Sequence, residues 1–475
     1  MLESTTNRTH VVWSIENNCL DDNLIAFMRD EGVEAVRLVS ESGDMETSLT
    51  FAKKLKSELR SVGSYVPIIV DMIDRVRAAI TGLAFGVEIG FGDMVTFVPA
   101  GGDGDFEIET KEWDRLFRQD VAVFMGSGQL VLEPTEIGQD SVTLRVIQGG
   151  LVQPGMELHC PGTDEAPVFT DVTREEITRV CQGEVDCVVV PGFSGASDLQ
   201  KMKSAFEEEA GGDPPWIFLK IDSAETFRNL NELLPHCHGV LISRVELAMS
   251  LDPARIPMIT KEIIQLCNHH ARIAWVASEI LGSMRYNATP TRAEVSDIAN
   301  AALDGADGVV LSEDLPYGKF ARRGLELARK TIHDIEKHLS AGSTNWMKTT
   351  PEINDEHAAV TFTAWRTAQR NNARAIVCLT KFGNTALLLS SFRTNIPIIA
   401  VTLSEAVNRR LSLVRGVTGI VLELAPGIDD VLPIINERIV RDTWLEAGDK
   451  IVFVAVSLSS VGEHASNLFT VQTLK

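Results

Sequence analysis

The sequence lacks the marks of a membrane, secreted or nucleic-acid-binding protein. Nowhere in its 475 residues does a run approach the roughly 18 consecutive apolar residues of a membrane span. The first nine residues contain no apolar segment that would act as a signal peptide. Basic residues are in the minority, 44 Lys and Arg against 66 Asp and Glu, and the formal net charge is −22. Nucleic acid and anionic membranes both require a basic surface, so neither is expected as a partner, and we expect a cytoplasmic protein.

Disulfide and metal-binding cysteine patterns are also absent. The seven cysteines form no CxxC pair, and most lie in apolar stretches typical of buried strands or helices. We expect them to be reduced core thiols. A hydrophobic share of 44% with 23% charged residues is typical of a soluble globular protein, and the length predicts two or three domains.

What the sequence does contain is an alternation of short β-branched runs with amphipathic stretches of roughly ten to fifteen residues, the pattern of parallel βα units. Between about residues 73 and 161 the pattern lapses, and Gly, Val and Thr at short strand spacings predict a small all-β insert. Three strands are predicted before the insert and five after it, and eight is the strand count of a TIM barrel. The eight are His10–Ile15, Ala35–Ser40, Val66–Met72, Cys187–Gly192, Trp216–Asp222, Gly239–Arg244, Arg272–Ser278 and Gly308–Ser312.

A polar stretch, Ser340–Thr350, separates the barrel pattern from a further set of βα units. Their strands suffice for a separate open sheet. The predicted fold class is therefore α/β: a (β/α)8 TIM-type barrel with an inserted small β-barrel lid domain and a C-terminal open α/β sheet domain. The predicted domains are 1–72 with 162–340 for the barrel, 73–161 for the lid and 341–475 for the C-terminal domain.

One stretch of the chain carries a specific signature. Residues 290–294 read PTRAE, residues 297–301 read DIANA and residues 303–307 read LDGAD. This stretch resembles the pyruvate kinase motif PTRAE–DVANAxLDGxD almost letter for letter. Weaker likenesses lie in the right order at Arg37–Asp44, Trp216–Asp222, Ile242–Ala248, Val276–Met284 and Thr380–Ala386, so the resemblance covers nearly the whole chain. It implies transfer of a phosphoryl group from phosphoenolpyruvate to ADP, giving pyruvate and ATP.

Phosphoryl transfer needs positive charge beside the moving group, and in a TIM barrel such residues lie at the C-terminal ends of the strands. Lys220 ends an apolar strand, where an ammonium group is costly unless it faces a polar site, and the resemblance implies that it stabilises the phosphoryl group. A rim lysine in a surface ion pair is the alternative. Arg37 is a candidate phosphate clamp, and Ser278 keeps a hydroxyl where the family has a threonine near the enolate.

Two carboxylates stand where the family holds its catalytic divalent metal. They are Asp222 and Glu246, in place of a Glu and an Asp respectively, so their lengths are exchanged. A shifted Mg²⁺ or Mn²⁺ would meet them, and two solvated acids at strand ends are the alternative. Val245 and Ala248 replace glycines whose backbone N–H groups approach the substrate in the family. We therefore expect weakened substrate capture at Val245, Glu246 and Ser278, because a β-branched residue restricts that turn.

The monovalent-cation, nucleotide and lid positions are more altered. Asp71 is a retained candidate ligand for K⁺, but Val39 stands where the family has an asparagine that helps hold the ion, so K⁺ binding is doubtful. If one residue is deleted after Asp71, Arg77 matches an arginine that contacts nucleotide phosphate, and a basic surface turn is the alternative. In the lid, residues 126–128 read GSG where the family usually has Asp-Asp-Gly, which removes two carboxylates from a turn that closes over the site.

The C-terminal domain carries a candidate effector loop. Thr380, Gly383, Asn384 and Thr385 retain a glycine and hydroxyls suited to a phosphate nest before a helix. Phe382 replaces a hydroxyl residue, however, and residues 457–467 lack the Trp and Arg that grip a sugar bisphosphate in relatives. We therefore expect effector binding to be lost.

Two functions are open at this point. The first is a pyruvate kinase-like protein whose catalysis is weakened or lost through its altered cation, nucleotide and lid residues. The second is an active pyruvate kinase with altered metal and K⁺ dependence, and a barrel for another enolate reaction is a more distant third. Phosphoenolpyruvate and ADP or ATP are the expected ligands of the first two. The resemblance also implies a homotetramer, or a hetero-oligomer with a relative.

Overall fold

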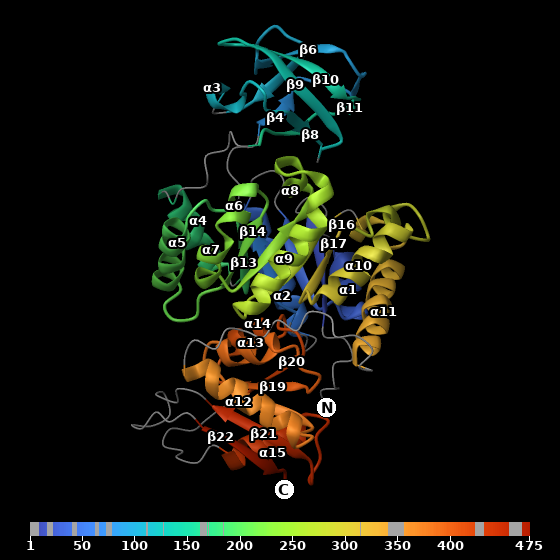
Figure 1. Ribbon diagram of the computed structural model, residues 1–475. Coiled ribbons are helices and arrows are strands. Elements are labelled where there is room, and N and C mark those ends of the chain that lie inside the picture. Colours follow the sequence, from blue (N-terminus) through green and yellow to red (C-terminus); the bar gives the residue numbers. More distant parts are fainter. Residues whose placement is uncertain are drawn as a thin grey trace.

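The computed structural model describes residues 9–16, 22–39, 45–61, 66–72, 78–110, 113–126, 128–161, 169, 171–183, 185–313, 315–340, 356–422, 432–455 and 468–475. They form three stacked bodies: an all-β domain at the top of Figure 1, a central barrel, and a C-terminal sheet domain below it. The predicted fold class is confirmed. The predicted domain boundaries border segments outside the described residues and stay predictions.

The central body is a closed ring of eight parallel strands in the order β1-β17-β16-β15-β14-β13-β3-β2. Helices surround the ring, so the strands are buried on both faces and read as runs of Val, Ile and Leu (Figure 1). The eight predicted strands are confirmed, with ends that differ by at most two residues. Their bounds are β1 His10–Glu16, β2 Ala35–Val39, β3 Ile68–Asp71, β13 Cys187–Val190, β14 Trp216–Ile221, β15 Gly239–Ser243, β16 Ile273–Ile280 and β17 Gly308–Leu311.

The helices of the barrel domain follow the strands in the chain. Their bounds are α1 Asp22–Glu31, α2 Met45–Ser61, α4 Asp171–Gln182, α5 Ala196–Glu209, α6 Ala224–Arg228, α7 Leu230–Leu233, α8 Arg244–Ser250, α9 Ile256–His269, α10 Arg292–Asp304 and α11 Ala321–Ser340. The helix of the family signature, α10, begins with a complete capping box, in which the Thr291 and Glu294 side chains bond each other's backbone N–H groups. It ends at Gly305, whose left-handed backbone (φ 87°) suits glycine. Three of the signature's letters, Thr291, Glu294 and Gly305, are thus explained by helix capping.

The lid is inserted between β3 and α4. It is a closed seven-stranded barrel in the order β10-β6-β7-β4-β12-β8-β9, with a two-stranded ribbon, β11-β5, beside it. The bounds are β4 Ala78–Thr81, β5 Val87–Ile89, β6 Met94–Pro99, β7 Phe106–Glu109, β8 Val123–Met125, β9 Leu130–Ile137, β10 Val142–Gln148, β11 Gly150–Val152 and β12 Glu157–His159, with a one-turn helix α3 Trp113–Leu116. The predicted all-β insert is therefore confirmed as a barrel.

The C-terminal domain is a five-stranded sheet in the order β20-β19-β18-β21-β22, with β22 antiparallel to its neighbour. Its strands are β18 Ala375–Leu379, β19 Ile398–Thr402, β20 Val417–Val421, β21 Lys450–Ala455 and β22 Leu468–Thr473. Its helices are α12 Glu356–Arg370, α13 Asn384–Ser391, α14 Glu405–Leu411 and α15 Leu432–Asp442. Helices α13 and α14 lie between this sheet and the barrel (Figure 1).

Apolar packing joins the barrel to the C-terminal domain. Inside the ring, Phe218 stacks on Trp275 with ring centroids 4.0 Å apart, and both belong to a buried cluster that continues into Leu387 of α13 and Leu411 of α14. Gly383 packs so closely on Trp216 that a Cβ there would lie 2.8 Å from the indole ring. The end of the barrel at which the strands begin is therefore covered by the C-terminal domain.

Ion pairs reinforce the same interface. Four arginines of the C-terminal domain each meet an acid of the barrel domain: Arg393 with Asp307, Arg409 with Asp186, Arg410 with Asp213 and Arg415 with Glu336. Most of these side chains are buried, and a buried charge is tolerated when it is paired and hydrogen-bonded. The interface is therefore specified by charge as well as by apolar contact.

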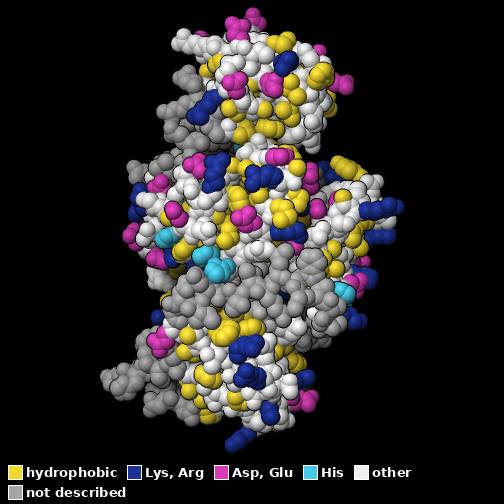
Figure 2. Space-filling model, viewed as in Figure 1, with side chains coloured by type: hydrophobic (Ala, Val, Ile, Leu, Met, Phe, Trp, Pro, Cys, Tyr) yellow, Lys and Arg dark blue, Asp and Glu magenta, His cyan; other side chains and the backbone are white. Residues whose placement is uncertain are grey.

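The outer surface is mixed. Figure 2 shows basic, acidic and apolar side chains interspersed over the visible face of the barrel domain. None of the helices in the described part of the chain has the length and apolar character needed to cross a bilayer.

The Arg393–Asp307 pair provides a test of this interface. Asp307 accepts from Arg393 at 2.6 Å and from the Ala274 backbone N–H at 2.9 Å, and its side chain is 4% exposed. Asp307→Ala leaves both donors without this acceptor and should lower the free energy of unfolding by about 3–5 kcal/mol in urea denaturation. The control is Asp198→Ala, which breaks a more exposed pair with Lys201 and should cost less than about 1 kcal/mol. Equal losses in the two variants would refute a structural role for Asp307.

Candidate functional site

The predicted site residues gather at the end of the ring opposite the C-terminal domain. Arg37 lies in β2, Asp71 ends β3, Lys220 lies near the end of β14, and Glu246 lies in the first turn of α8, directly after β15. Because parallel strands all end at the same rim of a barrel, these side chains meet at one mouth. The lid stands over this mouth in Figure 1.

Lys220 and Glu246 form the first of two ion pairs at the mouth. The ammonium Nζ lies 3.1 Å from Glu246 Oε1, and the Ser243 hydroxyl donates to Oε2 at 2.5 Å. Burial alone would raise the pKa of Glu246, but the charge of Lys220 and the hydrogen bond from Ser243 outweigh it and lower the pKa to about 2. Lys220 is therefore a buried, charge-paired lysine, and not a surface one.

Arg37 is the centre of the second ion pair. Its Nε and Nη2 donate to the two oxygens of Asp71 at 2.9 and 2.5 Å, and its Nη1 donates to Glu313 at 3.2 Å and to the Ser14 hydroxyl at 3.4 Å. Burial would lower the pKa of Arg37, but Asp71 and then Glu313 raise it, so the guanidinium stays charged. The predicted phosphate clamp is thus already held by two carboxylates.

Glu313 is a site residue that sequence reasoning missed. It lies two residues after the end of β17, at the same rim as Asp71, and that position was the available signal. Burial raises the pKa of Glu313 most, Arg37 opposes this, and the nearby charges of Asp71 and Glu246 raise it further. Since Glu313 is coupled electrostatically to both ion pairs, they belong to one cluster.

Asp222 directly follows β14 and lies close to Gly192, two residues after the end of β13. A Cβ added to Gly192 would lie 2.4 Å from both Asp222 Oδ1 and Thr226 Oγ1, so the carboxylate and hydroxyl lie together in space that only glycine leaves open. Glu246 and Asp222 follow neighbouring strands, since β14 pairs with β15 from Phe218 to Ile221. The two predicted metal ligands are therefore on adjacent strand ends.

Ser278 lies in β16 and Val245 in α8, and Arg244, the first residue of α8, links the two elements. Arg244 donates to the carbonyls of Ala277 and Ser278 at 3.1 and 2.7 Å. Ser278 has a left-handed backbone with φ 80°, which is uncommon for a residue other than glycine. Val245 is the second residue of α8. The structure thus places both residues at the mouth, and their predicted roles stay predictions.

The lid approaches the mouth through its glycine turn. A Cβ added to Gly128 would lie 3.6 Å from Cε of Met249, one helical turn after Glu246 in α8. Ser127, between the two glycines, lies outside the described residues, as does Arg77, the candidate nucleotide contact.

The candidate effector loop is built into the contact with the barrel. Gly383, which precedes α13, has φ 95° and donates its N–H to the Thr380 hydroxyl at 3.0 Å. The Thr385 hydroxyl lies 3.2 Å from Nε2 of His357, and both threonines are buried, whereas Asn384 is exposed. Two of the hydroxyls expected to meet a phosphate are therefore already hydrogen-bonded within the protein.

Comparison with known proteins relates both parts of the chain to one family. Residues 6–325 match the family described as pyruvate kinase, barrel domain, and residues 358–471 match pyruvate kinase, alpha/beta domain. A pyruvate kinase of Sporosarcina psychrophila is 25% identical over 458 residues, which cover 94% of this chain and 77% of that protein. A pyruvate kinase of Eimeria tenella is 27% identical over 465 residues, which cover 95% of this chain and 86% of that protein. The crystal structure of a pyruvate kinase from Cryptosporidium parvum matches with a TM-score of 0.82 at 24% identity, covering 99% of this chain and 97% of that one.

The Lys220–Glu246 pair should make stability depend on pH in a defined window. The pKa of Glu246 falls from 4.5 to about 2 on folding, so within this range the unfolded chain takes up the proton more readily. The stabilisation is complete above pH 4.5 and is lost as the pH falls toward 2, and its size is on the order of 3 kcal/mol. Glu246→Gln should flatten this slope in urea unfolding measured between about pH 3 and 6.

The matched control is Glu225→Gln, which removes an exposed carboxylate of the nearby helix α6. Its unfolding free energy should follow the parent's pH profile. If Glu246→Gln also kept the parent's slope, Lys220 would not be holding Glu246 in its ionised form.

Proposed function

The chain belongs to the pyruvate kinase family, and on this premise we propose that it binds phosphoenolpyruvate at the barrel mouth but transfers the phosphoryl group to ADP weakly or not at all. The observation that carries the proposal is the state of Arg37, the expected phosphate clamp. Asp71 and Glu313 already accept its hydrogen bonds. An incoming phosphate must share the guanidinium with two carboxylates that repel it.

The charge balance of the mouth supports the same conclusion. Of the described residues there, Arg37 and Lys220 stand among four acids, Asp71, Asp222, Glu246 and Glu313, and a third base, Arg244, is already paired with Asp297 at 3.1 Å. Phosphoenolpyruvate is itself a polyanion, and a site whose acids outnumber its bases opposes its entry. A divalent cation would bring the missing positive charge.

The donor set of Asp222 and Glu246 fits Mg²⁺ or Mn²⁺. Mg²⁺ commonly binds one or two carboxylates and completes its shell with water and substrate oxygens. Asp222 and Glu246 follow adjacent strands, and the low pKa keeps Glu246 ionised. Among the described residues, no group of three or more His, Cys, Asp or Glu side chains is arranged around a metal position, so substrate oxygens would supply the remaining ligands. A bound ion would neutralise charge on those oxygens.

Pyruvate kinases normally use K⁺ as well, and here the fit is poorer. Both oxygens of Asp71 accept from Arg37, and Val39 has no side-chain oxygen to offer.

The Arg37–Asp71 pair also favours the second candidate function, an active pyruvate kinase with altered metal and K⁺ dependence. A fixed guanidinium supplies positive charge where the ion would otherwise be needed. Under either candidate function, we expect the chain to associate with copies of itself or with a related chain.

Steady-state kinetics with phosphoenolpyruvate and ADP separate the two candidates. The assay covers Mg²⁺ and Mn²⁺, each with and without K⁺. We expect turnover far below the typical kinase range of about 1–100 s⁻¹, and a rate within about tenfold of that range would overturn the proposal of weak catalysis. Where no turnover is found, a thermal-shift titration with phosphoenolpyruvate tests whether binding persists.

Lys220→Ala should abolish any turnover while circular dichroism shows an intact fold. Undiminished activity in this variant would show that Lys220 has no catalytic role.

Removing Glu313 tests the electrostatic argument directly. Glu313→Ala frees one hydrogen-bonding position of Arg37 and deletes a like charge from the mouth, so phosphoenolpyruvate should bind about threefold to tenfold more tightly. The measurement is the half-saturation concentration in a thermal-shift titration with Mg²⁺ present. Glu326→Ala removes an exposed carboxylate of α11 and should leave that concentration unchanged. If Glu313→Ala behaved like the control, Arg37 would not be obstructed by Glu313.

A further inference from the structure

A cavity lies at the opposite end of the barrel from the mouth. Its volume is about 360 Å³, and it is lined by side chains of α2, α4 and α5 from the barrel domain and of α14 from the C-terminal domain. Asp186, on its wall, precedes β13, and Pro215 precedes β14, so the cavity lies where the strands begin. It therefore shares no residue with the candidate site at the strand ends. Its size falls at the lower end of the range of about 300–1,000 Å³ that small-molecule pockets occupy.

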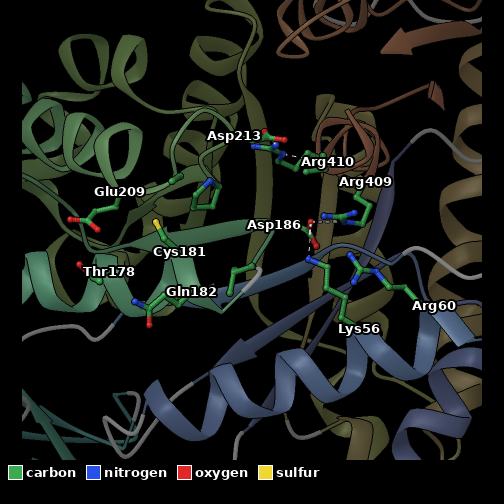
Figure 3. Close-up of a pocket in the computed structure, with 14 residues that line it drawn as sticks. Lys56, Arg60, Thr178, Cys181, Gln182, Asp186, Glu209, Asp213, Arg409 and Arg410 are labelled. Carbon is green, nitrogen blue, oxygen red and sulfur yellow. Dashed lines mark hydrogen bonds and ion pairs between the residues drawn. The ribbon is translucent and has the colours of Figure 1, made fainter. Parts of the chain in front are cut away.

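Three of the four basic side chains of this cavity lie on one side of it, around the carboxylate of Asp186. Lys56 and Arg60 of α2 and Arg409 of α14 face the side on which Asp186 lies, whereas Glu209 lies across from them (Figure 3). The remaining base, Arg410, pairs with Asp213 at the edge. Of the described residues that line the cavity, four are basic and three are acidic. The balance is thus positive in a protein whose net charge is −22.

The carboxylate of Asp186 is the organising group of the basic side. Its side chain is 1% exposed, and its oxygens accept from Arg409 at 2.8 Å and from the Ile68 backbone N–H at 3.0 Å, with Lys56 Nζ at 3.6 Å. Lys56 and Arg409 are themselves less than a tenth exposed. Two buried cations therefore share one buried carboxylate, and a further cation, Arg60, lines the same side. Like charges crowded in this way attract an anion, because it relieves their mutual repulsion.

We propose that this cavity is a binding site for a small phosphate- or carboxylate-bearing metabolite, which would hold α14 of the C-terminal domain against α2 of the barrel domain. Arginine presents a planar fork of donors that matches both kinds of oxyanion, and lysine adds a point charge. The cavity is walled by both domains, so a ligand that fills it stabilises their contact. The proposal does not depend on whether the barrel mouth is catalytically active.

Cys181 supplies a local reporter of occupancy. It lines the cavity and is half-buried, whereas the other described cysteines are buried. Burial, with a smaller effect of Glu209, raises the pKa of its thiol to about 11, so alkylation should be slow enough to follow by peptide mass spectrometry. The probes are inorganic phosphate and citrate, titrated at constant ionic strength against iodoacetamide. Saturating ligand should slow Cys181 alkylation at least about fivefold, and the more protective probe identifies the preferred oxyanion.

Matched variants assign the effect to this cavity. Arg60→Gln should raise the half-protecting concentration about threefold to tenfold, and Glu209→Gln should lower it, because each changes one charge on opposite sides of the cavity. Lys53→Gln removes one exposed charge from the same helix α2 outside the cavity and should have no effect. Lys220→Ala, at the other end of the barrel, should also leave the concentration unchanged. Arg60 and Glu209 are exposed, so these variants should fold.

Three results would overturn the proposal. The first is that neither probe slows alkylation of Cys181. The second is that Arg60→Gln and Lys53→Gln need the same concentration as the parent, since general stabilisation of the fold by phosphate or citrate acts on all variants alike. A shift in Lys220→Ala equal to that in Arg60→Gln would likewise place the binding at the barrel mouth.

Discussion

Closure of the eight parallel strands is the constraint on which the rest of the molecule depends. A parallel ring directs all of its strand ends to one rim, so residues from β2, β3, β14 and β17, far apart in sequence, meet without any local contact in the chain. The ring is held closed by a filled interior, in which Phe218 and Trp275 stack. The other rim is covered by α13 and α14, and this leaves the strand ends facing the lid.

That convergence explains why charge dominates the site. Groups that the ring brings within hydrogen-bonding distance must either pair or repel, and here they pair: Arg37 with Asp71 and Glu313, and Lys220 with Glu246. The pairing satisfies buried charges in the absence of substrate. The same pairing opposes catalysis, because a phosphate gains only the difference between its own contacts and those it displaces. The state of the ion pairs, more than the loss of any one family residue, is the physical basis of the weak activity we propose.

Much of this architecture could be predicted from the sequence, and the exceptions have physical causes. Buried parallel strands such as Cys187–Val190 are continuous β-branched runs and are easy to recognise. The lid strands β5 and β11 have three residues each and are half exposed, so they carry almost no periodic signal. The lid also contains a parallel pair, β6 with β7, whose partners no local pattern specifies. Sequence patterns report burial along one strand, not which strands meet.

The same limit applies to the site. Lys220, Asp222 and Glu246 were found because they fit a family pattern at strand ends, whereas Glu313 and the four arginine–acid pairs at the domain interface were not. Arg409 and Asp186 are 223 residues apart, and Arg393 and Asp307 are 86 apart. Neither residue of such a pair carries a sign of its partner, so only the fold reveals it. Glu313 could have been found by asking which acids follow each predicted strand.

The two proposed sites are joined by the strands between them. Strand β13 begins beside Asp186 at the cavity and leads to Gly192, against which Asp222 packs, and β14 begins at Trp216 and carries Lys220. A ligand at one end influences the other only if it binds two arrangements of these strands unequally. Any such coupling must be reciprocal, so a substrate that altered phosphate binding at the cavity would itself be bound differently when the cavity is filled. Because different residues carry the two proposals, an experiment that refutes binding at the mouth leaves binding at the cavity untouched, and the reverse also holds. Coupling between the two sites is a third property, which neither proposal alone implies.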